Sequence, residues 1–260
     1  MSRRRETYHA RLREAVEQGP GEAPATIHER VAAKEEGLEK FLVYDRFPRM
    51  SLQDHVVPPL LSLDEIEGEA TLELGQFAGE PYLDMTPLSL GAERPEWPDR
   101  KIELGREDFC GEVPLAVQKT IAFEKNRAGF SVHYRVSSRG GRLVSFRFGV
   151  EWNLNLLADS PGRFCLIDGE RPADPGLAGR GEREGVKKLE LVNQDDGFKA
   201  VIACSAPALL FRHPIETVSQ SESGFERSFQ GSCLWFTWPL RLRPGQGFRV
   251  SLDFDLEGLA

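Results

Sequence analysis

The chain has 260 residues, of which 40% are hydrophobic and 28% are charged, and its formal net charge is −8 at pH 7. This length fits one large all-β domain or two ordinary domains. The acidic balance argues against a nucleic-acid or anionic-membrane surface, so we expect neither partner, and the short basic stretch SRRRE near the start is too brief to reverse this.

The first part of the chain predicts a helical lead-in segment. Residues 3–18 place Tyr8 and Leu12 near helical spacing without a breaker, which predicts one amphipathic helix. A stretch rich in Gly and Pro ends it. A second helix is expected over 27–42, because Thr26 can cap it and an acidic residue stands three positions further on, as in a capping box.

From residue 41 on, the sequence reads as strands separated by Gly and Pro. The segments 116–124 and 129–137 alternate in polarity around KNRA, which indicates a hairpin. The run 143–158 is long enough for a bent strand that crosses a sheet. Residues 187–205 repeat the alternation around the turn NQDDG, and 234–257 supply two final strands around RPGQG.

About ten or more antiparallel strands do not remain one flat open sheet. Two large twisted sheets packed face to face are the economical arrangement. We therefore predict a mostly β fold, a large antiparallel two-sheet supersandwich over residues 41–260, with a short helical segment over residues 1–40.

The four cysteines, Cys110, Cys165, Cys204 and Cys233, lie far apart without CxxC spacing. Three of them lie in apolar runs, which favours buried free thiols over a disulfide or a metal site. The sequence has no apolar signal core at its start and no run of transmembrane length. These features predict a cytoplasmic protein.

The histidines do not form a metal motif. His9, His28, His55, His133 and His213 are isolated, and none has HxH or HxxxH spacing, so we expect no metal and no other cofactor. A Ser or Cys nucleophile is also unsupported, because no GxSxG-type elbow occurs.

The segment VYDRFPRMSLQDHVVPP at 43–59 packs charged side chains between apolar residues. One interpretation is a solvated loop with local ion pairs, each worth less than about 1 kcal/mol at a surface. The other is a polar cluster at an interface or cleft, where Arg side chains hold carboxylates bidentately. The candidate residues are Asp45, Arg46, Arg49, Asp54 and His55.

The segment VEWNLNLLA at 150–158 places Glu151, Asn153 and Asn155 on one strand face and Trp152 on the other. The polar face could bond sugar hydroxyls, or it could be the outward side of a sandwich strand. Both interpretations stay open, and Glu151 and Asn153 are candidates for contacts with carbohydrate or with a neighbouring domain.

The segment TVSQSESGFERSFQGS at 217–232 contains two glutamates, Glu222 and Glu226, four residues apart. On one extended strand they would share a face, unless Gly224 forms a bulge. Paired carboxylates cleave glycosides with about 5 Å between them for retention. Four extended residues span roughly 13 Å, which is too far for a retaining pair. Both glutamates and Gln230 are candidates for carbohydrate or interface contacts.

Four of these segments together resemble the C-terminal β-sandwich of glycoside hydrolase family 57 α-amylases and 4-α-glucanotransferases. Their order and wide spacing match as well, so the likeness covers nearly the whole chain. The segments are RRRETYH (3–9), YDRFPRMSLQDH (44–55), VEWNLNLLA (150–158) and TVSQSESGFERSFQGS (217–232).

The resemblance implies a supersandwich like that of galactose mutarotase, packed against a catalytic (β/α)-barrel in the same or a separate chain. In that family the nucleophile and the acid/base belong to the barrel, and no segment of this sequence is similar to the barrel. The resemblance therefore implies no catalytic residue here and a role beside an α-1,4-glucan site. It also implies a C-terminal domain that is shortened at its N-terminal side.

Two alternatives remain: a mutarotase-type enzyme and a free-standing carbohydrate-binding domain. The first would use His133 or His213 with Glu151 or Glu226 for acid/base chemistry. Aromatic surfaces suit sugar rings, although core packing accounts for any one tryptophan as well. With a spacing of three, Trp235 and Trp238 are expected on opposite strand faces. The tryptophan candidates for stacking are Trp97, Trp152, Trp235 and Trp238.

Overall fold

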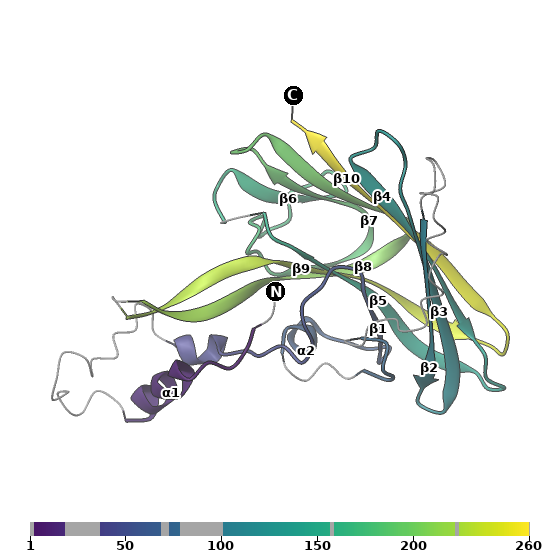
Figure 1. Cartoon of the computed structure of the whole chain (residues 1–260), viewed down its shortest axis with the longest axis horizontal. Helices are drawn as coiled ribbons and strands as arrows, with labels where there is room; N and C mark the ends of the chain where they lie inside the picture. The colour runs from purple at the N-terminus through teal and green to yellow at the C-terminus, as the bar shows by residue number, and fades with distance from the viewer. Residues whose placement is uncertain are drawn as a thin grey trace, which may run out of the picture.

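The computed structural model describes residues 3–18, 37–68, 73–78, 101–156, 159–221 and 224–259. Over these residues helices are few and strands are long (Figure 1). The elements are α1 (Tyr8–Gln18), the 3-10 helix η2 (Leu38–Phe41), β1 (Gln53–Val57), α2 (Leu63–Glu67), β2 (Lys101–Cys110), β3 (Val113–Ala122), β4 (Gly129–Ser138), β5 (Val144–Leu154), β6 (Arg163–Ile167), β7 (Gly181–Asn193), β8 (Phe198–Ser221), β9 (Gly224–Leu242) and β10 (Gly247–Gly258).

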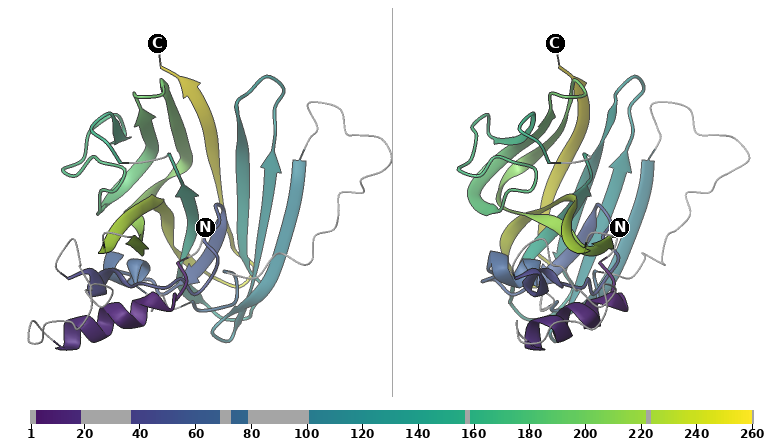
Figure 2. Two further views of the ribbon diagram at one scale, coloured as in Figure 1. Left: turned by 60° about the vertical axis from the view of Figure 1, so that its left-hand side comes forward. Right: turned by 90° about the vertical axis from the view of Figure 1, so that its left-hand side faces the viewer.

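The described strands form one ten-stranded antiparallel sheet in the order β1-β5-β9-β8-β10-β4-β3-β2, with β7 and β6 branching from β8. The prediction of a mostly β fold is confirmed. The two layers expected for a sandwich are halves of this one continuous sheet, which curls strongly in the views of Figure 2.

Strand β8 joins the two halves because it changes its neighbour along its length. Its residues 198–204 pair with β10, whereas its residues 209–221 pair with β9. Pro207 lies between these two stretches. A proline has no N–H to donate, so a ladder is interrupted where it stands. The chain therefore passes from one layer into the other at this position.

The two ends of the strand order, β1 and β2, are brought close to each other. The Leu74 amide donates to the Val56 carbonyl of β1 at 2.7 Å, and the Gly111 amide next to β2 donates to the Leu74 carbonyl at 3.1 Å. From β3, the Lys119 ammonium reaches Asp54 of β1 at 3.0 Å. These bonds nearly close the sheet on itself, which leaves fewer unpaired edge groups than an open sheet would have.

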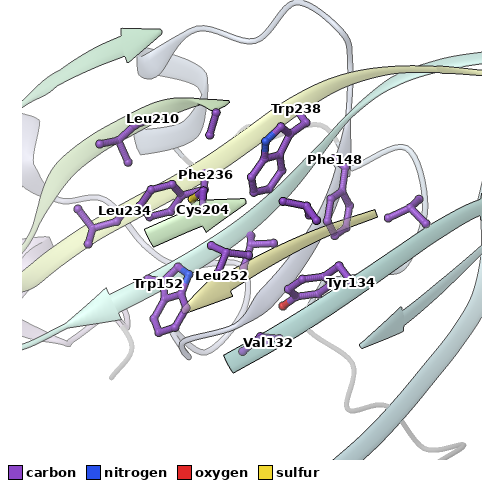
Figure 3. Close-up of a cluster of buried hydrophobic side chains, with 14 of the residues drawn as sticks. Val132, Tyr134, Phe148, Trp152, Cys204, Leu210, Leu234, Phe236, Trp238 and Leu252 are labelled. Carbon is purple, nitrogen blue, oxygen red and sulfur yellow. The ribbon is translucent and has the colours of Figure 1, made fainter. Parts of the chain in front are cut away.

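The core lies between the two halves of the sheet (Figure 3). Alternate residues of each strand point into it, as strand geometry requires. Tyr134 of β4 meets Phe148 of β5 with ring centroids 5.5 Å apart, although β4 and β5 are not neighbours in the sheet. On β10, Phe254 stacks with Trp152 at 5.6 Å. Aromatic residues therefore fill the space between the layers.

The helical segment packs on the long β8–β9 hairpin, away from this core (Figure 1). Leu12 of α1 and Leu38 of η2 form a small separate cluster with Val218 and Phe225 of the hairpin. Each of the four side chains is at most 2% exposed. The helix predicted over 3–18 is shorter and spans Tyr8–Gln18. Arg3 lies ahead of it and is bonded to Asp45.

The second predicted helix falls largely on residues 19–36, outside the described residues. Its described end is a 3-10 turn that begins behind Gly37, whose φ of 79° suits glycine and would strain another residue. The hairpin around KNRA is confirmed as β3–β4, and the turn NQDDG joins β7 to β8. The four cysteines are buried and free, as predicted.

Trp235 and Trp238 lie on opposite faces of β9, as their spacing predicts. Trp238 belongs to the central core and Trp235 to a second cluster under α2. Trp152 packs in the core, whereas Trp97 lies outside the described residues. Within the described part of the chain, no helix combines the length and apolar character needed to span a bilayer.

Candidate functional site

Polar side chains gather on the outer face of the β1–β5–β9 ladder, the face turned away from the core. The register aligns Gln53 of β1 with Glu151 of β5, and Glu151 with Trp235 of β9. Residues two apart share a face, so His55 and Asn153 also point outward from the core. A chain segment covers this face, which makes it a buried polar layer instead of a solvated surface.

The cover consists of α2 and the segment before β1. Leu63 and Ile66 of α2 pack on Trp235 and Phe211 in the second apolar cluster. A capping box at Ser62 fixes the start of this short helix. The segment from Tyr44 to Met50 runs alongside and places Arg49 over the polar layer. The polar side chains on this face are buried because α2 and this segment cover them. The sheet alone would leave them exposed to solvent.

His55 lies at the centre of the layer. Its Nδ1 lies 2.6 Å from a Glu73 oxygen and its Nε2 lies 2.8 Å from a Glu151 oxygen, while its ring stacks on Trp235 at 3.9 Å. Burial alone would lower the pKa of His55, but the charge of Glu73 and the bonds to both carboxylates raise this pKa to about 9. His55 is therefore a charged imidazolium that donates from both nitrogens.

Glu151 lies between two cations, His55 and Arg49, and also accepts from the neutral Asn153. Arg49 Nη1 donates to its Oε1 at 3.1 Å, and Asn153 Nδ2 donates to the same oxygen at 2.8 Å. Burial alone would raise the pKa of Glu151, but the hydrogen bond and charge of His55, together with Arg49, lower it to about 2. Glu151 is therefore ionised at any ordinary pH and bound on both oxygens.

Asp45 continues the layer toward the start of the chain. It accepts from Arg49 Nε at 2.8 Å and from the Arg3 guanidinium at 2.7 Å. The Arg3 backbone amide also donates to Asp45 at 2.7 Å. Burial alone would raise the pKa of Asp45, but the bonds of Arg3 and the charge of Arg49 lower it. Of the two interpretations of segment 43–59, this geometry supports the buried polar cluster.

Asn153 fixes the backbone of the covering segment. Its Nδ2 donates to the Met50 carbonyl at 3.0 Å, and its backbone amide donates to the Ser51 hydroxyl at 3.0 Å. The segment 217–232 is tied to the same region, because Tyr8 and His9 both lie within hydrogen-bond distance of the Val218 carbonyl. The segments 3–9, 44–55 and 150–158 therefore meet around this layer, and segment 217–232 contacts the first of them.

Two of the predicted cluster residues lie elsewhere. Asp54 points to the opposite side of β1, into the molecule, where Lys119 lies at 3.0 Å. Strand alternation separates it from its neighbour His55. Burial raises the pKa of Asp54, against the lowering effects of Lys119 and Tyr134. Arg46 is exposed, and its guanidinium lies over the Phe47 ring.

The expectation of one extended strand through Glu222 and Glu226 is wrong. Ser221 and Gly224 pair with each other, so the chain reverses between them. Glu222 lies outside the described residues, and Glu226 is half-buried on β9. The bulge lies at Gln230, not at Gly224, because the register shifts between Ile215 and Glu216 there.

Gln230 donates to the Thr217 hydroxyl at 3.2 Å across the hairpin. It therefore stabilises the pairing of β8 with β9 at the bulge. Neither Gln230 nor Glu226 is joined to the buried layer by a described contact. The structure brings Asp45, Arg49, His55, Glu151 and Asn153 together and leaves the hairpin candidates apart.

The mutarotase-type pairs do not form among the described residues. His133 is exposed on β4, whereas His213 is 1% exposed on β8 and donates from Nδ1 to the Pro214 carbonyl at 2.9 Å. Burial and the nearby charge of Arg49 lower the pKa of His213 to about 4. The histidine that contacts Glu151 is His55. The described residues include no cluster of three or more potential metal ligands.

Several members of the layer carried no signal in the sequence. Glu73 stands between two leucines and Gln53 beside Asp54, and neither position belongs to a recognisable motif. Only the fold brings Glu73 to His55. Cys233 was predicted to be buried, but its contact with Arg49 Nη1 at 3.1 Å was not. Arg3 belongs to the RRRETYH segment, which carried part of the family resemblance. That segment gave no indication of the bond between Arg3 and Asp45.

The layer is suited to holding the covering segment, not to proton transfer. A general acid or base works best with a pKa near the working pH. Glu151 and His55 have pKa values moved in the opposite directions, to about 2 and about 9. The protein is therefore a β-sandwich domain. Its buried ionic layer holds α2 and the segment before β1 against the outer face of the sheet.

The family follows from the sequence comparison. Residues 1–252 match the family described as "Alpha-amylase/4-alpha-glucanotransferase, C-terminal". The chain belongs to this family.

Relatives and a solved structure agree with this membership. Alpha-amylase 1 of Dictyoglomus thermophilum is 29% identical over 98% of this chain and 34% of its own length. The 4-alpha-glucanotransferase of Thermococcus kodakarensis is 29% identical over 92% of this chain and 31% of its own length. The crystal structure of 4-alpha-glucanotransferase from Thermococcus litoralis superposes with a TM-score of 0.62 and 25% identity, over 85% of this chain and 29% of that chain. The chain thus spans about a third of the length of the curated relatives it matches.

Proposed function

We propose that this chain is a non-catalytic module of an α-1,4-glucan-processing hydrolase or transferase. In this role it buttresses a catalytic (β/α)-barrel domain, carried on the same or a separate chain, and contributes to glucan binding. The observation that carries the proposal is the match of nearly the whole chain to about a third of an alpha-amylase. The remaining two thirds of that relative would correspond to the partner.

The chemistry of the polar layer supports a structural role. Its charged groups bind one another, and Glu151 has cations on both of its oxygens. An ionised carboxylate held in this way is a poor proton donor. The layer instead keeps the segment around Arg49 rigid, and rigid presentation favours binding because little conformational entropy is lost on association.

The face over residues 41–49 is the one best suited to dock a second domain. Three cavities, of about 50, 220 and 160 Å³, adjoin this segment. Arg3 borders two of them, so a domain joined ahead of Arg3 would lie at this face. Met50 is 50% exposed beside the segment, and Arg46 and Pro48 also project from it. Met and Arg side chains are enriched at protein interfaces.

We also propose that the module acts in the cytoplasm. All four cysteines are buried as free thiols. A reducing compartment keeps thiols in this state, whereas oxidising compartments favour disulfides. Measuring the distribution of the protein between cell fractions, with a secreted control, would test this part.

The test of the main proposal uses the purified chain. It should release no reducing sugar from amylose, transfer no maltooligosaccharide and leave the anomeric equilibration rate of glucose unchanged. Hydrolysis, transfer or mutarotation by the chain itself would overturn the proposal. The first two would show a catalytic site in this chain, and the third would favour the mutarotase-type alternative.

A chimera tests the partner. The C-terminal third of Dictyoglomus thermophilum alpha-amylase 1 would be replaced by this chain, with the remaining two thirds alone as the control. The chimera should be more active or more heat-resistant than the control, because the sandwich covers the surface that deletion exposes. A chimera no better than the control would contradict the buttressing role.

A further inference from the structure

Two arginines lie directly opposite each other on the outer face of the β4–β10 ladder. The register aligns Arg135 of β4 with Arg249 of β10, and these strands run side by side (Figure 1). The neighbouring residues Tyr134 and Val250 point into the core, so both arginines point away from it. Both are exposed, and together with Gly247 they line an open cavity of about 350 Å³. Cβ atoms at opposite positions are about 5 Å apart, so both guanidinium groups can reach one ligand.

This pairing is unfavourable within the chain itself. Like charges at directly opposite positions of a ladder destabilise a sheet. Among the described residues, neither guanidinium has a carboxylate or other hydrogen-bond partner. Arg127 beside β4 differs from them, because it lies 2.6 Å from Asp255 and 3.7 Å from Asp253 of β10. The same two strands therefore neutralise one arginine and leave two others uncompensated.

The neighbours of the pair on this face carry no negative charge. They are Gln118, opposite Arg135 on β3, and the residues two positions away on β4 and β10, which are His133, Ser137, Gly247 and Ser251. Two strands away on β2, the glutamates already have partners: Glu103 pairs with Lys101, and Glu107 pairs with Arg139. The counter-charge for the pair must therefore come from another molecule.

The connection from β9 to β10 increases the positive potential at this end of the sheet. Arg241 and Arg243 are exposed there and line a second open cavity together with Gln246, the residue before Gly247. Among the described residues, their guanidinium groups have no carboxylate partner either. The whole chain has a net charge of −8, so this group of arginines is a local reversal of charge that attracts anions.

The geometry favours a phosphate group as the ligand. A guanidinium presents a planar fork of donors that matches two oxygens of a phosphate, and two such forks meet here. One dianion would neutralise both arginines and remove their repulsion. The hydroxyl of Ser137, on the same face, supplies a further donor.

The size of the site favours a small molecule. A cavity of about 350 Å³ is at the lower end of the sizes known for small-molecule sites. It leaves room beside the phosphate for an organic group. The acidic surface elsewhere on the chain would repel a nucleic acid or an anionic membrane, whose charges extend far beyond two arginines.

We propose that Arg135 and Arg249 bind the phosphate group of a small phosphorylated molecule, a phosphomonoester of about monosaccharide size. The two guanidinium groups bind the phosphate oxygens, and the organic group lies in the remainder of the cavity. This site lies on β4 and β10, in the layer opposite β1 and β5, so it is separate from the face over residues 41–49 and does not depend on the proposed function.

Titration calorimetry of the whole chain at low ionic strength, with glucose 6-phosphate, inorganic phosphate and glucose, tests this. Glucose 6-phosphate should bind more tightly than inorganic phosphate, and added salt should weaken both. Arg135→Gln and Arg249→Gln should each lower the affinity for glucose 6-phosphate about tenfold. Any binding of glucose should be the same in both variants and the unchanged chain. Arg142→Gln is the matched control, because its side chain is 79% exposed and paired with Glu112, and it should bind as the unchanged chain does.

Unchanged affinity in both variants would overturn the proposal, as would an absence of binding by either phosphate compound. Equal affinity for inorganic phosphate and glucose 6-phosphate would overturn the assignment of an organic ligand. An equal loss in Arg142→Gln would show an effect of net charge alone and would also overturn the site.

Stability without ligand gives a second, independent measurement. Arg135→Gln should raise the urea midpoint of the unliganded chain, because it removes a like-charge contact. Glucose 6-phosphate should raise the midpoint of the unchanged chain and have a smaller effect on the variant. A lower midpoint in unliganded Arg135→Gln would show that the pair is compensated within the chain, and this would contradict the proposal.

Discussion

His55 shows how single residues define the polar layer. It contacts two carboxylates, and each carboxylate has a further partner, so displacing one side chain leaves an uncompensated buried charge. Buried ion pairs add little net stability over well-packed apolar groups, but the loss of one member is costly. The layer therefore fixes one arrangement of the covering segment against alternatives that would leave charges unpaired.

Replacing Glu151 tests this at the level of one residue. Glu151→Gln keeps the shape and removes the charge that faces both His55 and Arg49. The free energy of unfolding should fall by about 3–5 kcal/mol, because two buried cations lose their shared counterion. Urea denaturation followed by circular dichroism measures the change.

A surface pair provides the control for this variant. Glu107 lies 3.0 Å from Arg139, and both side chains are more than half exposed. Glu107→Gln should cost less than about 1 kcal/mol, since solvent screens the pair. A similar small loss in Glu151→Gln would mean that the layer does not hold the fold together.

The sequence indicated part of this layer and missed the rest for a physical reason. Asp45 and Arg49 stand four apart in one segment, so their bond is local and was open to prediction. Glu73 reaches His55 across 18 positions of sequence, and Glu151 reaches it across 96. Such contacts depend on strand order, which residue spacing alone does not fix.

At the level of elements, strand alternation accounts for most of what could be predicted. It placed Glu151 and Trp152 on opposite faces, and the core contains Trp152 as expected. It could not reveal that the outer face is covered, because the covering segment comes from a distant part of the chain. The neighbour switch of β8 at Pro207 also depends on which strands lie on either side.

The contact between α1 and the β8–β9 hairpin gives a prediction for elements. Leu12→Ala removes a buried side chain from the small cluster with Val218 and Phe225, which is separate from the core. The hairpin end and α1 should therefore open locally, because local clusters unfold at lower free energy than the core.

Amide hydrogen exchange measures this opening. In Leu12→Ala, exchange in α1 and around Val218 should accelerate, while β3 and β4 keep their protection. Arg11→Ala, at an exposed position on the same helix, should change neither region. Uniform acceleration through all strands would instead show that the cluster belongs to the global folding unit.

For the whole molecule, closure of the sheet and the buried charges act together. The contact of Leu74 with Val56 and the ion pair of Lys119 with Asp54 join the two ends of the strand order. The polar layer then ties the start of the chain to β1 and β5. These contacts hold the segment before β1 in one position, which suits the proposed supporting role.

The stability of the molecule should depend on pH through two buried histidines. The folded pKa of His55 is about 9, above its ordinary 6.5, so its contribution is full below pH 6.5 and is lost as the pH rises through 9. The folded pKa of His213 is about 4, so its contribution is full above pH 6.5 and is lost as the pH falls through 4. Stability should therefore be greatest near pH 6.5.

Urea denaturation between pH 4 and pH 9 measures this profile. His55→Gln should flatten the alkaline limb, because glutamine carries no charge to lose. His213→Gln should flatten the acid limb down to about pH 4.5, below which Glu151 begins to protonate in the unfolded chain. An alkaline limb that persists in His55→Gln would show that another group is responsible.

The sequence by itself determined the class of fold, the strand alternation, the buried thiols and the family to which the chain belongs. These properties depend on local patterns of polarity or on motifs, and such patterns persist whatever the strand order. Only the tertiary structure decided that Asp54 faces Lys119 and that Glu73 contacts His55 in the polar layer. It alone also decided that Ser221 pairs with Gly224 at the end of the β8–β9 hairpin. Those outcomes depend on which distant segments meet, and the cover over β1 and β5 settles them.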